Sequence, residues 1–227
     1  MRNPLNFDSN VTPRPDLPWT PPLPVIGLLG GVASGKSLVA QRLLEHGAGL
    51  LDGDRAGHAV LCLPEVELAA RQRWGDTIFT PDGRISRPAV AKIVFAPPPE
   101  GPPELHYLEQ LTHPLIGQEL RRQAASMASS GNHAALVMDA PVMLKSGWNK
   151  FCNQIWFVDA PPHVRLARAL ARGWSAESFI RREESQEPLE VKRSHADIVI
   201  DNSGSRDETH QQIDRHWQTF LQQHVRQ

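Results

Sequence analysis

Residues 30–37 carry the residue types and the spacing of a phosphate-binding loop. Their sequence, GGVASGKS, matches the pattern G-x-x-x-x-G-K-[ST] at every fixed position. Glycines let the backbone turn tightly and aim successive N–H groups at an anion, and the positive end of a following helix strengthens that attraction. We therefore expect Lys36 to reach the β- and γ-phosphates of a nucleoside triphosphate and the Ser37 hydroxyl to bind Mg²⁺. A glycine-rich turn that binds nothing is the alternative.

The segments on either side of this loop are those that such a motif requires. An apolar run at residues 25–29 predicts a buried strand before it, and residues 38–46 predict a helix after it. The motif therefore predicts the class of ligand. It does not identify the group that receives the phosphate.

Carboxylates follow two further predicted strands. Residues 50–54 (LLDGD) predict a short buried strand that ends in Asp52 and Asp54, and residues 134–139 predict an apolar strand that ends in Asp139. Because ligands of an open parallel sheet gather beyond the carboxyl ends of its strands, either Asp52 or Asp54 could accept a proton from an attacking hydroxyl. The other, or Asp139, could hold water around the metal. A turn that caps the next helix explains the Asp52–Asp54 segment equally well.

The middle of the chain has a different pattern. Residues 55–130 show successive helical patterns without a clear strand, which predicts a helical insert at an edge of the sheet. A proline-rich run at residues 96–103 predicts an exposed loop. His113 and Pro114 predict the start of a new helix, because proline suits a first turn, and a single histidine there is more typical of capping or packing than of a ligand.

Strands and helices alternate again after the insert. Residues 155–158 predict a strand, and the helix that follows places Arg165, Arg168 and Arg172 on one face. Further basic residues up to position 193 favour an arginine-bearing lid over the transferring phosphoryl group, with a solvated basic face as the alternative.

The last predicted strand and helix complete the sheet. Residues 197–201 predict the strand, which leads into a turn at Asn202-Ser203-Gly204 whose backbone could meet a nucleotide base. The closing helix, from Asp207 to about His224, would bury the apolar residues spaced for one helix face, which are Ile213, Trp217, Phe220 and Leu221.

Composition limits the remaining possibilities. The chain has 227 residues, enough for one core domain with a smaller insert, and a net charge of −1 gives no overall basic field for nucleic acid or anionic lipid. Two cysteines outside any C-x-x-C pair suit a reducing cytosol, and no apolar run approaches the ~20 residues that span a bilayer. We therefore expect a cytoplasmic protein. Residues 1–24 are rich in proline and polar residues and predict a disordered tail without a catalytic role.

Taken together and in order, the landmarks of the chain resemble the dephospho-CoA kinase family. The resemblance extends from about Val25 to Gln223. The landmarks are the phosphate loop, Asp52-Gly53-Asp54, residues 82–87, Ile93-Val94-Phe95, Leu108-Glu109, Thr112-His113-Pro114, Asp139-Ala140-Pro141, the arginine helix, Gln186, Ala196-Asp197 and Asn202-Ser203-Gly204. Many kinases share the phosphate loop alone, whereas the combination is far more restrictive.

The resemblance implies an α/β fold of the three-layer P-loop NTPase type with a five-stranded parallel sheet. The kinase domain would cover residues 25–227, with a helical substrate-binding insert at about 62–130 and a lid at about 163–193. The implied reaction is transfer of the ATP γ-phosphoryl group to the ribose 3′-hydroxyl of dephospho-CoA with Mg²⁺, the last step of coenzyme A biosynthesis. The expected partners are these small molecules, without nucleic acid or a membrane, in a monomer or a weak homo-oligomer.

Carried over residue by residue, the resemblance assigns roles. Asp54 would be the general base, and Lys36 with Arg172 would stabilise the transferring group, with Arg168 as the second candidate for the lid arginine. The ATP-binding residues would be Gly31, Val32, Ala33, Ser34, Gly35, Lys36, Ser37, Leu38, Arg168, Asn202 and Gly204, with Ser37 also on the metal. The substrate-binding residues would be Asp54, Arg87, Phe95, His113 and Asp139. The chain departs from the family at Leu29, at Val142-Met143, at Lys145 and in its unusually proline-rich loop.

Two alternative functions remain open at the level of sequence. One is a P-loop kinase for another small hydroxyl acceptor, such as a nucleoside, a nucleotide or shikimate. The other is a nucleotide-dependent switch ATPase. A GTPase would need the base-reading pattern N-K-x-D, which residues 149–152 (NKFC) do not complete.

Overall fold

The computed structural model describes residues 19–225, so most of the predicted tail lies outside the described residues. At the start of the described chain, the Trp19 ring meets Phe151 edge-on, with 5.1 Å between the ring centroids. The chain divides into two compact units. We call residues 55–119 the helical unit, and residues 19–54 together with 120–225 the sheet unit.

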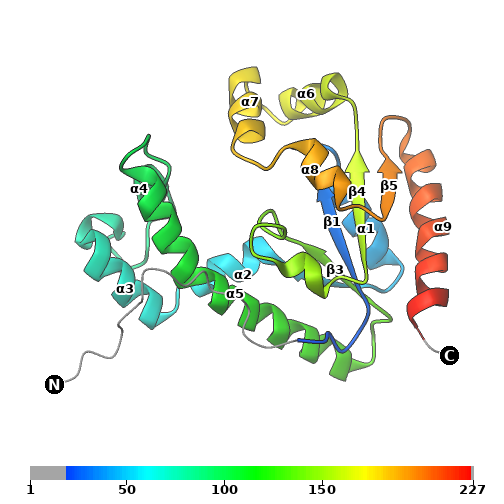
Figure 1. The fold of residues 1–227 in the computed structure, drawn as a ribbon, viewed down its shortest axis with the longest axis horizontal. Coiled ribbons are helices and arrows are strands. Elements are labelled where there is room, and N and C mark those ends of the chain that lie inside the picture. Colours follow the sequence, from blue (N-terminus) through cyan, green and yellow to red (C-terminus); the bar gives the residue numbers. More distant parts are fainter. Residues whose placement is uncertain (1–18, 226–227) are drawn as a thin grey trace. The chain divides into compact units, whose positions relative to one another are not determined.

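Five parallel strands form the core of the sheet unit (Figure 1). Their spatial order is β2-β3-β1-β4-β5, which confirms the predicted five-stranded parallel sheet and the α/β class. All six residues of β1 are buried, as expected for the central strand of a sheet that is covered on both faces. The strands are Val25–Gly30 (β1), Gly49–Asp52 (β2), Leu136–Asp139 (β3), Gln154–Asp159 (β4) and Ile198–Asp201 (β5).

Two helices cover one face of this sheet, α1 (Lys36–Glu45) and α9 (Arg206–His224). Their buried apolar side chains join those of the strands in one cluster, and the predicted core residues of α9 are confirmed, with Leu221 partly buried. Helix α9 starts with a capping box in which Ser205 and Glu208 satisfy each other's backbone N–H groups. Arg42 of α1 pairs with Asp214 of α9 through two hydrogen bonds of 2.7 and 2.8 Å.

Three short helices follow β4 in the segment that was predicted as a lid. They are α6 (Pro162–Ala171), α7 (Ala176–Glu184) and α8 (Leu189–Ser194). The arginine face of α6 is turned to the phosphate loop, since Arg165 and Arg168 donate to the carbonyls of Val32 and Ser34. Arg165 is buried and also forms an ion pair with Glu183 of α7, which links α6 to α7.

The helical unit follows the predicted succession of helices. Helix α2 (Gly53–Val60) leads into it, α3 (Pro64–Trp74) and α4 (Arg87–Val94) lie within it, and α5 (Gly101–Ser130) leads out of it. Its small apolar core joins Ala70 of α3 to Val90 and Val94 of α4.

The prediction that a new helix starts at His113 and Pro114 is wrong. A single helix, α5, runs through Pro114 and begins as early as Gly101, inside the predicted proline-rich loop. The prolines after Gly101 suit a first turn, where backbone N–H groups have no helical partner. Within the helix, Pro114 lacks the N–H for one backbone bond, but Ile116 and Leu120 on the following turns are buried and stabilise the helix through packing.

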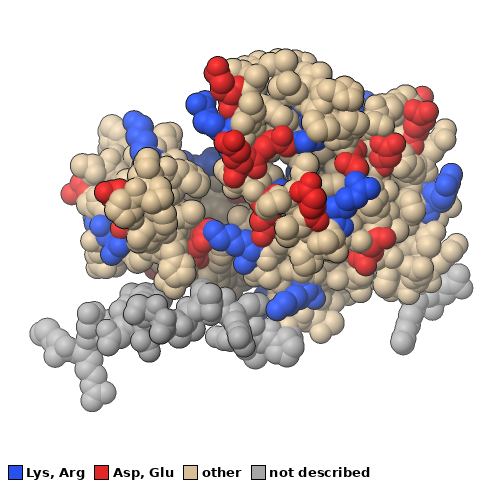
Figure 2. Space-filling view, turned by 45° about the horizontal axis from the view of Figure 1, so that its top comes forward, with Lys and Arg blue, Asp and Glu red and all other residues tan. Residues whose placement is uncertain are grey.

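Acidic and basic side chains are interspersed on the face that Figure 2 presents. This matches the balanced composition of 24 basic and 25 acidic residues. Among the helices of residues 19–225, none combines the length and the apolar character that crossing a bilayer requires.

Candidate active site

The phosphate loop connects the end of β1 to the start of α1. Its backbone enters the left-handed region twice, at Ala33 (φ 57°) and at Gly35 (φ 104°). A Cβ atom at Gly35 would collide with the side-chain amide of Asn202, so both conformation and space require glycine there. Ala33 has a side chain, so its left-handed backbone conformation is energetically unfavourable. Strained residues of this kind are typical of ligand-binding turns.

Charged groups concentrate where β2 and β3 end beside this loop. The register of the sheet pairs Asp52 with Asp139, and Asp139 with Leu28, two residues before Gly30 ends β1. Burial lowers the pKa of Lys36, while the negative charges of Asp139 and then Asp54 act to raise it. Burial also raises the pKa of Asp139, and the Lys36 ammonium opposes that shift. The carboxylates therefore lie within electrostatic reach of the loop lysine.

Asp54 is not part of a strand end, and that detail of the prediction is wrong. Strand β2 stops at Asp52, and α2 begins at Gly53, so Asp54 lies in the first turn of a helix. A Cβ atom at Gly53 would lie 2.6 Å from the Cβ of Ala140, so only glycine lets α2 start against the end of β3. A carboxylate is favourable at a helix N-terminus. The segment thus starts a helix and also brings Asp54 within reach of Lys36.

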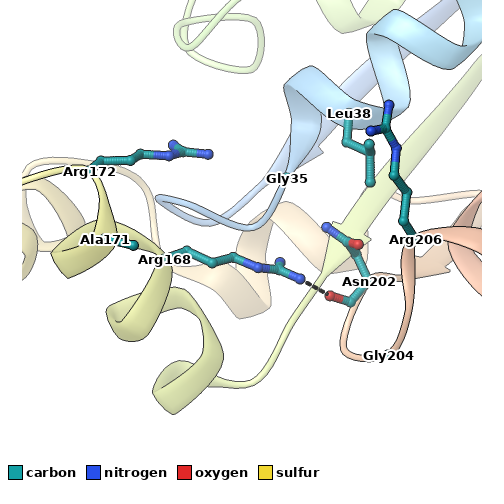
Figure 3. Close-up of a pocket in the computed structure, with 8 residues that line it drawn as sticks. All are labelled: Gly35, Leu38, Arg168, Ala171, Arg172, Asn202, Gly204 and Arg206. Atoms are coloured by element: carbon teal, nitrogen blue, oxygen red, sulfur yellow. Dashed lines mark hydrogen bonds between the residues drawn. The ribbon is translucent and has the colours of Figure 1, made fainter.

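A pocket of about 370 Å³ lies beside the phosphate loop (Figure 3). It brings together residues of the loop, of α6 and of the turn after β5, which are far apart in sequence. Six of its residues are among the predicted ATP-binding and catalytic positions, namely Gly35, Leu38, Arg168, Arg172, Asn202 and Gly204. The other two, Ala171 and Arg206, were not predicted. Arg206 is a basic residue in the first turn of α9, and such a residue has no distinguishing sequence pattern.

Two arginines of this pocket differ in what they contact. Arg168 donates to the carbonyl of Ser34 at 3.1 Å and to the carbonyl of Asn202 at 2.8 Å, the second of which is the dashed line in Figure 3. Arg172 is exposed, and within residues 19–225 its side chain makes no hydrogen bond or ion pair. Of these two arginines, Arg172 is therefore the one whose guanidinium makes no hydrogen bond to the described part of the protein.

A buried lysine also lies against the phosphate loop, and sequence reasoning missed its position. Lys192 of α8 is 5% exposed and donates to Gln186 at 2.6 Å and to the carbonyl of Gly30 at 3.5 Å. Burial, and next the nearby charge of Lys36, lower its pKa to about 8. Gln186 was a landmark of the family resemblance, but nothing in the sequence links it to Lys192.

The residues of the loop fit a triphosphate and Mg²⁺. The Ser34 hydroxyl is buried and has no hydrogen-bond partner within residues 19–225, which suits a ligand rich in acceptor oxygens. Ser37 is exposed in the first turn of α1. In the described part of the chain no group of three or more Asp, Glu, His or Cys side chains could hold a metal alone. Mg²⁺ binds through few protein ligands together with phosphates and water, and the Ser37 hydroxyl is the oxygen of the loop that could serve as one such ligand.

The other predicted substrate residues belong to the helical unit. Arg87 is the first residue of α4, and Phe95 follows its last residue with 69% of its surface exposed. His113 lies within α5. Their contact with the substrate stays a prediction.

A phosphate loop after the central strand of a five-stranded parallel sheet, with a pocket beside it, defines this protein as a nucleotide-binding protein of the P-loop NTPase fold. The solved structure of TT1252 from Thermus thermophilus has the same fold, with a TM-score of 0.73 and 29% identity over 87% of this chain and 97% of that one.

The particular family follows from the sequence comparisons. The family model described as dephospho-CoA kinase matches residues 24–208. A dephospho-CoA kinase from Carboxydothermus hydrogenoformans is 38% identical over 84% of this chain and 91% of the relative. One from Symbiobacterium thermophilum is 36% identical over 85% of this chain and 80% of the relative.

The chain belongs to the dephospho-CoA kinase family. It is an enzyme that uses ATP to phosphorylate dephospho-CoA in the last step of coenzyme A biosynthesis, and the predicted function is confirmed. Membership of this family identifies dephospho-CoA as the acceptor among those that the sequence left open. It also favours an enzyme over a nucleotide-dependent switch ATPase.

Proposed function

We propose that this kinase transfers the γ-phosphoryl group directly from ATP to the ribose 3′-hydroxyl of dephospho-CoA, with Asp54 as the general base. The observation that carries the proposal is the electrostatic interaction of Asp54 with the loop lysine, Lys36. A carboxylate in this position can accept the proton that the hydroxyl loses as its oxygen bonds to phosphorus. The bond that breaks joins the γ-phosphorus to the oxygen that stays on ADP.

The remaining groups of the loop would hold the triphosphate. Lys36 and the backbone N–H groups of residues 31–38 bind its oxygens, and the Ser34 hydroxyl supplies one further donor. Ser37 and, through water, Asp139 would hold Mg²⁺, which when bound neutralises charge on the β- and γ-phosphates.

Arg172 is the arginine that we assign to the transferring phosphoryl group. Its free guanidinium lines the pocket, whereas both amino groups of Arg168 are engaged with backbone carbonyls. An arginine that neutralises the transition state must be able to approach the phosphoryl oxygens when the substrates are bound. We also propose that residues 163–193, which include Arg172, act as the lid.

The helical insert, residues 62–130, is proposed to bind the coenzyme A moiety. Arg87, Phe95 and His113 would form its binding wall, and the exposed ring of Phe95 supports this role because it offers apolar surface to a ligand.

The free thiols of Cys62 and Cys152 support a cytoplasmic location. We expect a monomer or a weak homo-oligomer that binds small molecules rather than nucleic acid or a membrane.

A panel of acceptors tests the proposed reaction. Initial rates with ATP and magnesium are compared for dephospho-CoA, adenosine, AMP and shikimate, and the product is located by fragmentation mass spectrometry. We expect a phosphate on the ribose 3′-oxygen and at least a hundredfold preference for dephospho-CoA. A faster reaction with another acceptor, or a phosphate at a different oxygen, would contradict the proposal. Omitting magnesium should abolish turnover, which checks the proposed metal.

A further inference from the structure

A set of hydrogen bonds within the sheet unit ties the phosphate loop to the turn after β5. The carbonyl of Ser34 accepts from the side-chain amide of Asn202 at 2.7 Å and from Arg168 at 3.1 Å. Arg168 also donates to the backbone carbonyl of Asn202 at 2.8 Å. Asn202 is buried, with 3% of its surface exposed. One loop carbonyl is thus fixed by two donors that come from α6 and from the turn.

The position of Ser34 makes these bonds important for the shape of the loop. Ser34 lies between the two residues of the loop that adopt left-handed backbone conformations, Ala33 and Gly35. Such conformations persist when surrounding contacts hold them. The Asn202 amide also occupies the space that a Cβ of Gly35 would need. It therefore restricts the conformation of the loop by van der Waals contact as well as by hydrogen bonding.

The orientation of the Asn202 amide depends on a residue of α9. Thr209 is fully buried, and its hydroxyl lies 3.0 Å from Oδ1 of Asn202. The same hydroxyl lies 3.2 Å from the carbonyl of Ser205 and 3.4 Å from that of Asp201. A hydroxyl has one proton to donate, and the shortest of the three contacts is that to Asn202. This bond turns Oδ1 towards Thr209 and therefore turns the amide N–H₂ towards Ser34.

We propose that Thr209 is a positioning residue for ATP, which acts through Asn202 to hold the phosphate loop in its binding conformation. Thr209 is not itself part of the pocket lining, whereas Asn202 and Gly35 are. Loss of its hydroxyl leaves Oδ1 of Asn202 buried without a donor and lets the amide rotate, which frees the carbonyl of Ser34. The loop then samples other conformations and binds ATP more weakly. The inference rests on the proposed function only in taking this pocket as the ATP site.

Two variants separate the hydroxyl of Thr209 from its packing. Thr209→Val keeps the shape and removes the donor, whereas Thr209→Ser keeps the donor and removes a methyl group. We expect Thr209→Val to raise the ATP dissociation constant, measured by calorimetry, about 5- to 30-fold, as loss of a hydrogen bond in a buried polar pair does. The ATP KM should rise in parallel, and the dephospho-CoA KM should change less than twofold. Thr209→Ser should bind ATP within about twofold of the unchanged protein.

The outcomes that overturn the proposal are distinct. If Thr209→Val binds ATP as the unchanged protein does, or if Thr209→Ser is impaired as much as Thr209→Val, the hydroxyl does not position the loop. If Thr209→Val does not fold, Asn202→Asp replaces the amide donor by an acceptor that faces the Ser34 carbonyl, and it should weaken ATP binding at least tenfold. Normal ATP binding by that variant also overturns the proposal. Because calorimetry needs no acceptor, failure of the enzyme to phosphorylate dephospho-CoA would count against the proposed function and not against this inference.

Discussion

The residues assigned to ATP in the sheet unit are in contact with other parts of the protein, whereas Phe95 of the helical unit, which we assign to dephospho-CoA, is exposed. Arg168 and Asn202 are hydrogen-bonded to the phosphate loop, and Lys36 is partly buried among carboxylates. Phe95, by contrast, is an exposed ring at the end of a helix. We expect from this difference that the nucleotide site is preorganised by the fold, and that the ring of Phe95 becomes covered only when the acceptor binds.

The largest expected effect follows from removing the lysine of the phosphate loop. Lys36→Met should lower kcat with saturating substrates by about 10²- to 10³-fold, because a positioned charge on the transferring group is lost. Lys150→Met is the matched control, since Lys150 is an exposed lysine of the same unit, and it should be unchanged. A Lys36→Met enzyme within tenfold of the original rate would show that this site is not organised around the lysine.

Comparison of Arg168 with Arg172 tests the distinction between a pocket arginine that is hydrogen-bonded to the protein and one that is not. Arg172→Ala should lower kcat about 10- to 100-fold and leave Tm unchanged, because its guanidinium holds nothing in the protein without substrates. Arg168→Ala should instead raise the ATP KM and lower Tm, since two backbone carbonyls lose a donor. Steady-state kinetics and thermal unfolding of both variants check this. Exchanged behaviour of the two would reverse the assignment.

The helical unit should respond through the acceptor alone. Phe95→Ala should raise the KM for dephospho-CoA about fivefold, because apolar surface that covers the ligand is lost, and should leave the KM for ATP unchanged. Leu68 is also an exposed apolar residue of this unit, with 58% of its surface exposed, and Leu68→Ala is the control. Equal effects of the two substitutions would remove the special role of Phe95.

The smallest effect concerns the stability of the sheet unit at alkaline pH. The pKa of Lys192 is lowered from 10.5 to about 8 in the folded protein, so between these pH values the unfolded chain binds more protons. Stability from this residue therefore rises as pH increases from 8 to about 10.5. The Tm of the unchanged protein minus the Tm of Lys192→Met should therefore increase by a few degrees between pH 8 and about 10.5. A difference in Tm that stays constant with pH would contradict the lowered pKa.

Local patterns predicted much of this architecture. The phosphate loop, the five strands and the buried face of α9 follow from glycine spacing, apolar runs and helical periodicity, which are properties of short segments. The landmarks Asp52-Gly53-Asp54 and Asn202-Ser203-Gly204 carried the family resemblance. These features could be predicted because each is decided within a few residues of sequence.

Contacts between segments that are distant in the sequence could not be predicted from local patterns. Pro114 predicted a helix start, but burial of α5 beyond it keeps one helix intact. Arg168 and Arg172 look equivalent in sequence, and only the fold shows that one is engaged with Ser34 and Asn202. The burial of Lys192 likewise depends on packing of α8 against β1. Such differences arise from tertiary structure.

The central claim is that Asp54 removes the proton of the acceptor hydroxyl next to Lys36. Coenzyme A formation by Asp54→Asn, measured in single turnover by rapid quench with saturating substrates, tests it most directly, with Asp52→Asn as the matched control. We predict that Asp54→Asn slows the chemical step by at least about 10²-fold, as expected for loss of a general base, while ATP binding changes less than threefold and Asp52→Asn loses less than tenfold. A chemical step of unchanged rate in Asp54→Asn would contradict the account.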